Sequence, residues 1–205
     1  MNPLLAKLGI SPEAEAFFHA ESLCFDYGGV SEVYEEGYHY VPTTDGLWLA
    51  GNRYAQEVVI TNSAMQAIAW YAIHRSRYAD PAALTLVSLG NLPTPAQLSW
   101  LRSSFRRRKF TLVFDHSMLG NLTDIKAACL LKGKTISLCW QKEKTAVSYE
   151  GRTVYFDENC CSLHHFEKAF DLRLGIRTSK PALHTTYLTQ LQDDSSKIDY
   201  PQTRP

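Results

Sequence analysis

Three consecutive residues with metal-binding or proton-transferring side chains, Asp115, His116 and Ser117, come directly after a short apolar run. The run 110–114 has the composition of a buried strand, and a helical pattern begins a few residues later, beyond Gly120. This order places a carboxylate at the carboxyl end of a strand, where ligands bind in open α/β sheets. Asp115 is therefore a candidate site carboxylate, although it has few of the acidic neighbours that a metal site would need. His116 could be a ligand or an acid, although a solvated residue at a strand end is the favoured interpretation.

The elements that would position these residues follow a repeating order of strands and helices. Strands that alternate with helices of 10 to 15 residues form βαβ units, and hence a parallel sheet with helices on both faces. We expect strands at 58–60, 84–89, 110–114 and 136–140. We expect helices at 63–78, from Thr94 through Phe105, and from residue 121 or 122 to 131.

The segments on either side of this core have different patterns. A helix is expected to begin at Ser11, and aromatic-rich strands to follow it within 23–41. A hairpin is expected around Glu150-Gly151, and a helix from Leu163 to Phe170. The chain is thus divided into an N-terminal helix and strand-rich segment, an α/β core, a hairpin and helix extension, and a polar tail that is expected to be disordered. Their ranges are 1–54, 55–142, 143–176 and 177–205.

Composition narrows the class of protein. Hydrophobic residues make up 45% of the 205 residues, which is enough for an ordinary core. The 21 basic and 21 acidic residues balance, so attraction to nucleic acid would need a local basic patch. The apolar runs are too short for a transmembrane span, and the five cysteines follow neither a disulfide nor a zinc pattern. We expect a cytoplasmic protein with no membrane association.

Three stretches carry a resemblance to a known family, namely EVVITNSAMQAIAW, TLVSLGNLPTPAQLSWL and TLVFDHSMLGNLTDIKAA. In this order they resemble the strand and helix units of the toprim domain, the fold shared by bacterial-type primases, topoisomerases and related nucleases. The segment VYFDENCCSLHHF is similar to one that follows the sheet in primase-like members on mobile elements. The resemblance covers roughly residues 55 to 170. It implies a toprim-like four-stranded parallel sheet with helices on both faces.

The acidic residues that the family uses are mostly replaced in this chain. The resemblance implies a Glu at the end of the first strand, an Asp four residues later, and an Asp-x-Asp pair, which together bind Mg²⁺. This sequence has Asn62, Gln66 and Asp115-His116-Ser117 at those positions. One carboxylate holds Mg²⁺ weakly, and an amide cannot act as a general base at neutral pH. Asn62, Ser117 and His116 are therefore candidate site residues beside a vestigial Asp115, and a protein without catalysis and without a cofactor is favoured.

Other residues allow further interpretations. Arg102, Arg106, Arg107, Arg108 and Lys109 form a basic run that exceeds what capping a helix requires, so it is a candidate contact for nucleic acid phosphates. Because the run follows a helix, it is expected at the end of the sheet opposite Asp115. Asp157 and Glu158 could supply replacement acids, although loop or capping roles are favoured for both.

These observations lead to three functional hypotheses. The first is a degenerate, non-catalytic toprim-like protein of DNA metabolism on a mobile element, which binds DNA, RNA, or a replication or mobilisation protein. The second is a divergent Mg²⁺-dependent primase or nuclease-type phosphotransferase that uses Asp115. The third is a structural or dimerisation module with no nucleic-acid role.

Overall fold

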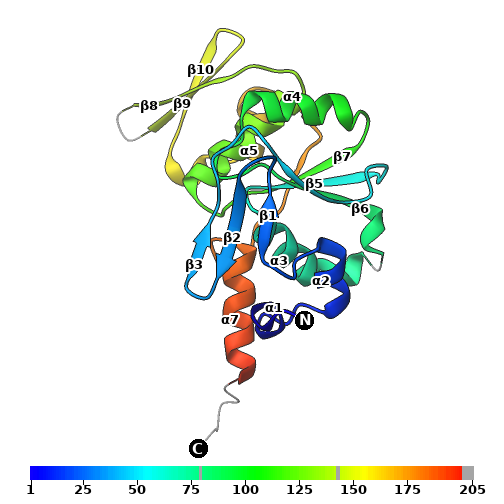
Figure 1. Cartoon of the computed structure of the whole chain (residues 1–205). Helices are drawn as coiled ribbons and strands as arrows, with labels where there is room; N and C mark the ends of the chain where they lie inside the picture. Colours follow the sequence, from blue (N-terminus) through cyan, green and yellow to red (C-terminus); the bar gives the residue numbers. More distant parts are fainter. Residues whose placement is uncertain (79, 142–143, 200–205) are drawn as a thin grey trace, which may run out of the picture.

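A five-stranded sheet forms the centre of the protein, whose computed structural model describes residues 1–78, 80–141 and 144–199 (Figure 1). Its strands lie in the order β11-β7-β5-β6-β4, and β4 at one edge runs antiparallel to the other four. The fold is therefore mixed α/β with a mostly parallel sheet, as the alternation of strands and helices predicts. The strands are β4 (Trp48–Gly51), β5 (Glu57–Thr61), β6 (Leu84–Ser88), β7 (Lys109–Val113) and β11 (Arg177–Thr178).

Three helices, each beginning at a hydroxyl side chain, connect or follow the central strands. They are α3 (Ala64–His74), α4 (Pro95–Ser104) and α5 (Met118–Leu131), capped by Ser63, Thr94 and Ser117. Figure 1 shows α4 and α5 on one side of the sheet and α3 on the other. Side chains that alternate along the strands follow this division, because Val58 and Ile60 pack with α4 and α5 whereas Val59 packs with α3. The prediction of helices on both faces is confirmed.

The start of α5 differs from the expected position. The helix begins at Met118, three or four residues before the predicted start, because Ser117 rather than a later residue caps it. Gly120 therefore lies in the first helical turn and not in a preceding turn. A Cβ atom at Gly120 would lie 1.9 Å from the carbonyl oxygen of Asp115. Glycine thus allows α5 to begin directly against the backbone of Asp115.

The predicted fourth strand does form, but in another sheet. Residues 136–140 overlap β8 (Ser137–Gln141), which pairs antiparallel with β9 (Lys144–Tyr149), and β9 pairs with β10 (Arg152–Phe156). β8 is mostly exposed, so it lacks the burial on both faces that a central parallel strand has. The fourth parallel strand is β11 instead. The prediction that residues 136–140 form a strand of the central parallel sheet is therefore wrong. The predicted hairpin around Glu150-Gly151 is confirmed, since β9 and β10 form it.

The N-terminal segment covers the α3 side of the sheet. It contains α1 (Pro3–Lys7), α2 (Pro12–Phe18) and an antiparallel sheet of β1 (Cys24–Asp26), β2 (Ser31–Glu35) and β3 (Tyr38–Tyr40). The predicted helix start at Ser11 is confirmed, since its hydroxyl accepts from the Ala14 amide at 3.3 Å. Apolar residues of α1, α2 and β1 share one buried cluster with α3.

The C-terminal residues are ordered further than expected. The prediction of a disordered tail over 177–205 is wrong for residues 177–199, which include β11 and α7 (Tyr187–Asp199), while residues 200–205 lie outside the described part. Tyr187 and Leu188 are buried, and α7 packs against α3. α6 (Leu163–Ala169) begins at the predicted residue and ends one residue before the predicted Phe170, which is its C-cap. Short 3₁₀ turns complete the elements at Arg75–Arg77, Pro81–Ala83 and Glu158–Cys160.

Among the described residues, no helix combines the length and the apolar character that crossing a membrane requires. The boundaries predicted at residues 54, 142 and 176 stay predictions.

Candidate functional site

The carboxyl ends of β5 and β7 bring Asn62 and Asp115 together. The two strands are parallel neighbours, with Thr61 opposite Val113, so the residues that follow them lie at the same edge of the sheet. The Asn62 amide nitrogen donates to the Asp115 carboxylate at 3.2 Å. Burial raises the pKa of the Asp115 carboxyl, whereas the Asn62 hydrogen bond and the Lys180 charge act in the opposite direction.

His116 and Ser117, which follow Asp115 in the sequence, form hydrogen bonds with other parts of the chain. The His116 ring nitrogen Nδ1 lies 3.1 Å from the carbonyl oxygen of Pro181. The Ser117 hydroxyl accepts from the Gly120 amide at 3.1 Å and caps α5. His116 thus fastens the segment before α7, and Ser117 has the role of a helix cap.

The Lys180 ammonium lies against the backbone that follows the carboxyl end of β7. It donates to the carbonyl oxygens of Phe114 at 3.0 Å and Asp115 at 2.8 Å, and it pairs with the Asp124 carboxylate at 2.7 Å. Asp124 lies on α5 and is almost fully buried. Burial raises the pKa of Asp124 to about 6, and the Lys180 charge keeps it from rising further. The positive charge between the backbone after β7 and the Asp124 carboxylate of α5 is therefore a side chain of the protein itself, Lys180.

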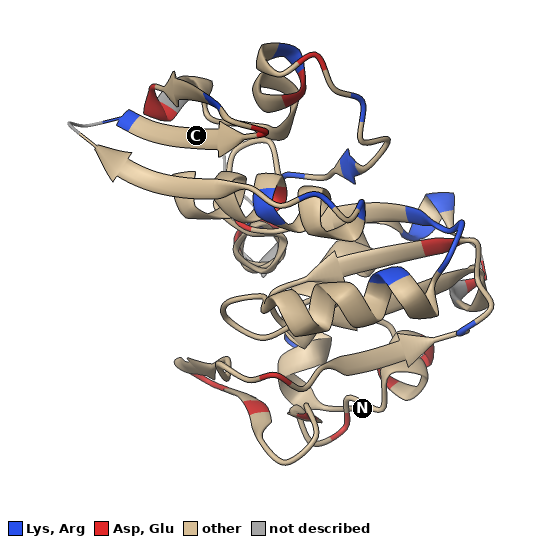
Figure 2. Cartoon of the chain, turned by 90° about the horizontal axis from the view of Figure 1, so that it is seen from above, with Lys and Arg blue, Asp and Glu red and all other residues tan. Residues whose placement is uncertain are grey.

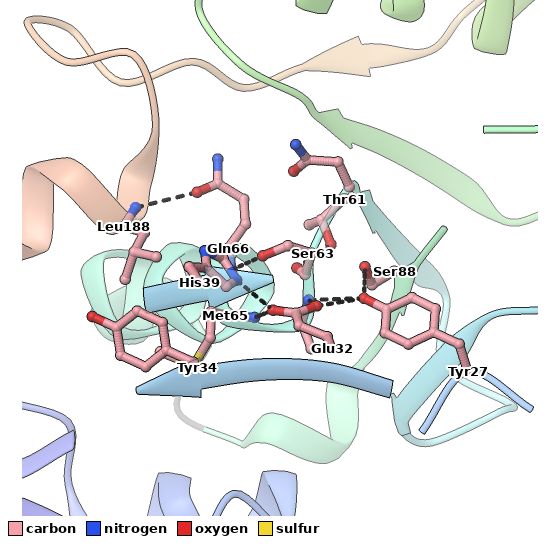
Figure 3. A network of polar contacts seen from close by, with 12 residues as sticks. Tyr27, Glu32, Tyr34, His39, Thr61, Ser63, Met65, Gln66, Ser88 and Leu188 are labelled. Atoms are coloured by element: carbon pink, nitrogen blue, oxygen red, sulfur yellow. Dashed lines mark hydrogen bonds and ion pairs between the residues drawn. The ribbon is translucent and has the colours of Figure 1, made fainter. Parts of the chain in front are cut away.

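Glu32 of β2 closes the amino end of α3. Its buried carboxylate accepts from the backbone amides of Ala64 at 2.7 Å and Met65 at 3.1 Å. The Tyr27 hydroxyl donates to it at 2.6 Å, and the His39 ring lies 2.9 Å away, as Figure 3 shows. A carboxylate at this position complements the helix dipole. The same carboxylate occupies the backbone donors that would otherwise attract an anion.

A cleft with a volume of about 340 Å³ opens beside Asp115. It is bounded by the β2–β3 hairpin, the amino end of α3, the tip of β7 and the first turns of α7. Among the described residues, two buried amide atoms of this lining, Asn62 Oδ1 and Gln66 Nε2, have no hydrogen-bond partner. The residues that line the cleft are Tyr34, His39, Val41, Asn62, Ser63, Gln66, Asp115, Thr186, Leu188, Thr189 and Gln192.

The cleft is poor in metal ligands. Asp115 is the one carboxylate that lines it, and the described part of the chain holds no group of three or more His, Cys, Asp or Glu residues that could bind a metal ion. Asp157, a possible replacement acid, pairs instead with Lys144 at 3.0 Å. The donor set does not fit the Mg²⁺ of the second hypothesis, because one carboxylate and amide groups supply too little negative charge.

The basic run lies at the other end of the sheet. Residues 106–108 form the connection into β7, and Lys109 is the first residue of that strand. Figure 2 shows Lys and Arg gathered at this end of the molecule. Arg102 lies apart from the run, against Gly133 at the end of α5, where a positive charge complements the helix dipole.

A hollow with a volume of about 440 Å³ lies beside the basic run. Arg108 and Arg53 contribute positive charges to it, while Tyr54 and Trp100 are aromatic residues with exposed fractions of 82% and 38%. Ser104 and Phe105 complete the lining. We call Arg53, Tyr54, Trp100 and residues 106–109 the basic end. The sequence alone did not predict the aromatic residues of the basic end, because Tyr54 is far from the basic run along the chain.

Comparison of the chain with protein-family models, with curated proteins and with solved structures gives no match.

Proposed function

We propose that this chain is a degenerate toprim-like protein of DNA metabolism on a mobile element, which binds single-stranded nucleic acid at the basic end. The succession β5-α3-β6-α4-β7-α5 supports the resemblance, because it has the order of strands and helices that the family implies. Asn62 and Asp115 follow β5 and β7, which are the positions where that family has acids.

The observation that carries the proposal is the combination of arginines and exposed aromatic rings in one hollow. Arginines pair with phosphates through several donors, and bases stack on aromatic rings irrespective of their sequence. Trp100 and Tyr54 stay exposed next to Arg53 and Arg108, although large aromatic side chains gain stability from burial. Stacking requires unpaired bases, so this surface favours single-stranded nucleic acid over a duplex.

The proposed role does not include phosphoryl transfer. Asp115 is the one carboxylate that lines the cleft and accepts a hydrogen bond from Asn62, and the amide that replaces the family's Glu cannot act as a base. The other buried acids near the strand ends are already engaged, Asp124 by Lys180 and Glu32 by α3. The binding role at the basic end therefore stands without a catalytic step at the cleft.

Reversing three charges of the basic end is expected to weaken binding of single-stranded DNA or RNA strongly. The variant Arg106→Glu/Arg107→Glu/Arg108→Glu should weaken binding on the order of 100-fold, because each lost phosphate contact also loses released counterions. For the unmodified protein, the plot of log K against log salt should have a slope of about −2 to −3, which corresponds to three or four contacts at about −0.7 each. Fluorescence anisotropy of a labelled oligonucleotide at several salt concentrations measures both quantities.

The matched control changes the same amount of charge elsewhere. Lys126, Lys132 and Lys168 are exposed on or beside α5 and α6, and their replacement by Glu should leave the affinity nearly unchanged. Equal weakening by both triple variants would show that only net charge matters. Absence of binding by the unmodified protein would favour the module without a nucleic-acid role, or a role that involves only a protein partner.

A further inference from the structure

The strand β8 leaves one of its edges without a partner. It lies at the end of the order β10-β9-β8, and no other strand of the described residues pairs with it. Figure 1 shows this three-stranded sheet projecting from the body of the protein, beside α4 and α5. Open edges are usually protected against pairing with another chain by charged side chains, by proline or by a very short strand. β8 has five residues, and none of them is charged or proline.

The other open edges of the two antiparallel sheets are protected in these ways. β1 and β3 have three residues each, and β10 begins with Arg152. β8 is therefore the edge of these sheets that is most open to another chain.

An apolar groove lies beside β8. Its volume is about 220 Å³, and residues of α4, α5, β8 and the connection before α4 line it. Leu92 and Leu119 in this lining are 47% and 60% exposed, and Leu138 lines the groove from β8. Lys126 is the one charged residue of the lining. Exposed apolar side chains that lie together in this way mark surfaces at which proteins associate.

Trp140 extends the same apolar surface. Leu138 and Trp140 are two residues apart in β8, so their side chains point to the same face of the sheet. Leu138 packs against the core cluster of α4 and α5, whereas Trp140 lies outside the groove and is 57% exposed. An aromatic side chain of this size gains stability when its roughly 150–250 Å² of surface is buried. Trp140 is thus an apolar side chain that the described part of the chain leaves uncovered.

The backbone of β8 presents hydrogen-bonding groups at the open edge. β9 pairs with β10 on one side and with β8 on the other, and the residues of such a strand bond alternately to its two neighbours. The β9–β10 hairpin closes at Tyr149, so the odd-numbered residues of β9 bond to β10 and Ala146 bonds to its partner in β8, Cys139. The N–H and C=O groups of Leu138 and Trp140, on either side of Cys139, therefore point to the open edge.

We propose that this edge joins two copies of the chain into a dimer, in which the two β8 strands pair antiparallel about a twofold axis at Cys139. In this register Leu138 of each copy lies opposite Trp140 of the other, and the outward N–H and C=O groups form the hydrogen-bonded pairs. Residues directly opposite lie on the same face of the sheet, with Cβ atoms about 4.5–5.5 Å apart. Each Trp140 is therefore placed against Leu138 of the other copy, at the groove that this leucine lines.

A second copy is the partner that this surface fits, because one chain supplies both halves of the contact. The exposed tryptophan and the leucine of the groove are two residues apart in β8, so a twofold axis midway between them brings each to the other. β8 is uncharged and Lys126 is the one charge of the groove, so the axis brings no cluster of like charges together. The surface has fewer residues than the roughly 20–30 a side of a standard interface, so we expect association in the micromolar range.

This dimer does not depend on nucleic-acid binding. β8 and the groove share no residue with the basic end, and self-association is measured without nucleic acid. A chain that dimerises without binding nucleic acid, or that binds it as a monomer, would separate the two proposals.

Sedimentation equilibrium of the full chain at about 1–300 µM measures the association. Trp140→Ala should weaken dimerisation roughly 30-fold or more, because it removes an aromatic side chain at the centre of the contact. Leu119→Glu places a charge in the groove and should weaken it similarly. Tyr38→Ala and Leu183→Glu make comparable changes at residues that are 54% and 91% exposed elsewhere, and should leave the dissociation constant within about twofold. Circular dichroism checks that each variant is folded. A monomer at every concentration, or dimerisation that is unchanged by both Trp140→Ala and Leu119→Glu, would overturn the proposal.

The exposed thiol of Cys139 tests the register. In the proposed dimer the two Cys139 residues form a non-hydrogen-bonded pair with Cα atoms about 4.5 Å apart, which is within the range of a disulfide. Diamide, which takes one hydrogen from each thiol, should therefore link two copies through Cys139. Cys139→Ser should abolish the linked dimer, whereas Cys24→Ser and Cys160→Ser, at the other exposed thiols, should not. A dimer linked only through Cys24 or Cys160, or no linkage at a concentration where the dimer is populated, would contradict the pairing of β8.

Discussion

Replacing Glu32 by leucine is expected to lower the free energy of unfolding by about 3–5 kcal/mol, the range for removing one partner of a buried charged group. The change would leave the backbone amides of Ala64 and Met65 and the hydroxyl of Tyr27 buried without their acceptor. It would also remove the negative charge at the start of α3, where it complements the helix dipole. Chemical denaturation followed by circular dichroism measures the difference.

Two further variants separate this effect from general changes in β2. Glu35→Leu alters an exposed residue of the same strand and should change the free energy of unfolding by no more than about 0.5 kcal/mol. Glu32→Gln keeps an acceptor oxygen and should fall between the two. If Glu32→Leu were as stable as Glu35→Leu, the carboxylate would not be what joins the N-terminal sheet to α3.

Replacing Lys180 by methionine is expected to lower the free energy of unfolding by about 3–5 kcal/mol at neutral pH. Asp124 would lose its ion-pair partner, so its buried carboxyl would either stay charged without a partner or bind a proton, and the carbonyl oxygens of Phe114 and Asp115 would lose their donor. The double variant Lys180→Met/Asp124→Leu should recover much of the loss, because a buried ion pair can be replaced by apolar residues of similar volume. Denaturation at a series of pH values measures both variants.

The exposed ion pair of Lys197 and Asp193 provides the control for Lys180. Lys197→Met breaks a pair whose partners are 66% and 39% exposed, and should cost at most about 1 kcal/mol. A loss for Lys180→Met as small as this would contradict a buried, structural role for the Lys180–Asp124 pair.

Asp124 also contributes to the pH dependence of stability. Its pKa in the folded protein is raised from an ordinary value of 3.8 to about 6. The folded state therefore binds more protons than the unfolded state between these two values, so the contribution of Asp124 to stability falls as pH rises through this window and levels off above about 6. Without Lys180 the pKa would rise further, and the decline should continue to higher pH.

The central strands were predictable because burial on both faces leaves a clear pattern. The apolar runs at 58–60, 84–89 and 110–114 correspond to β5, β6 and β7, and hydroxyl caps mark the helices after them. β11 has only two residues, Arg177 and Thr178, and it forms because β7 offers an open edge. A strand of two residues leaves no local sequence pattern from which it could be predicted. The helix α7 did leave a signal in the spacing of Tyr187, Leu188 and Leu191, which the polar residues around them obscured.

The candidate site was predictable only in part, for a similar reason. Asn62 and Asp115 could be placed together because residues after parallel neighbouring strands share one edge of the sheet. Glu32 and Lys180 reach the same region from the N-terminal sheet and from the segment after β11. Nothing in a strand of alternating polar residues or in a polar tail distinguishes them, since their roles arise from tertiary contacts that bring distant segments to α3 and β7.

The most direct test of the proposed function is to map where single-stranded nucleic acid touches the protein. Ultraviolet cross-linking of a thymine-rich oligonucleotide, followed by mass spectrometry of the peptides, reports aromatic side chains that stack on bases. The account predicts cross-links at Tyr54 and Trp100, which lie in the hollow of the basic end. Cross-links confined to other aromatic residues, or cross-linking that persists undiminished in the Tyr54→Ala/Trp100→Ala variant, would contradict it.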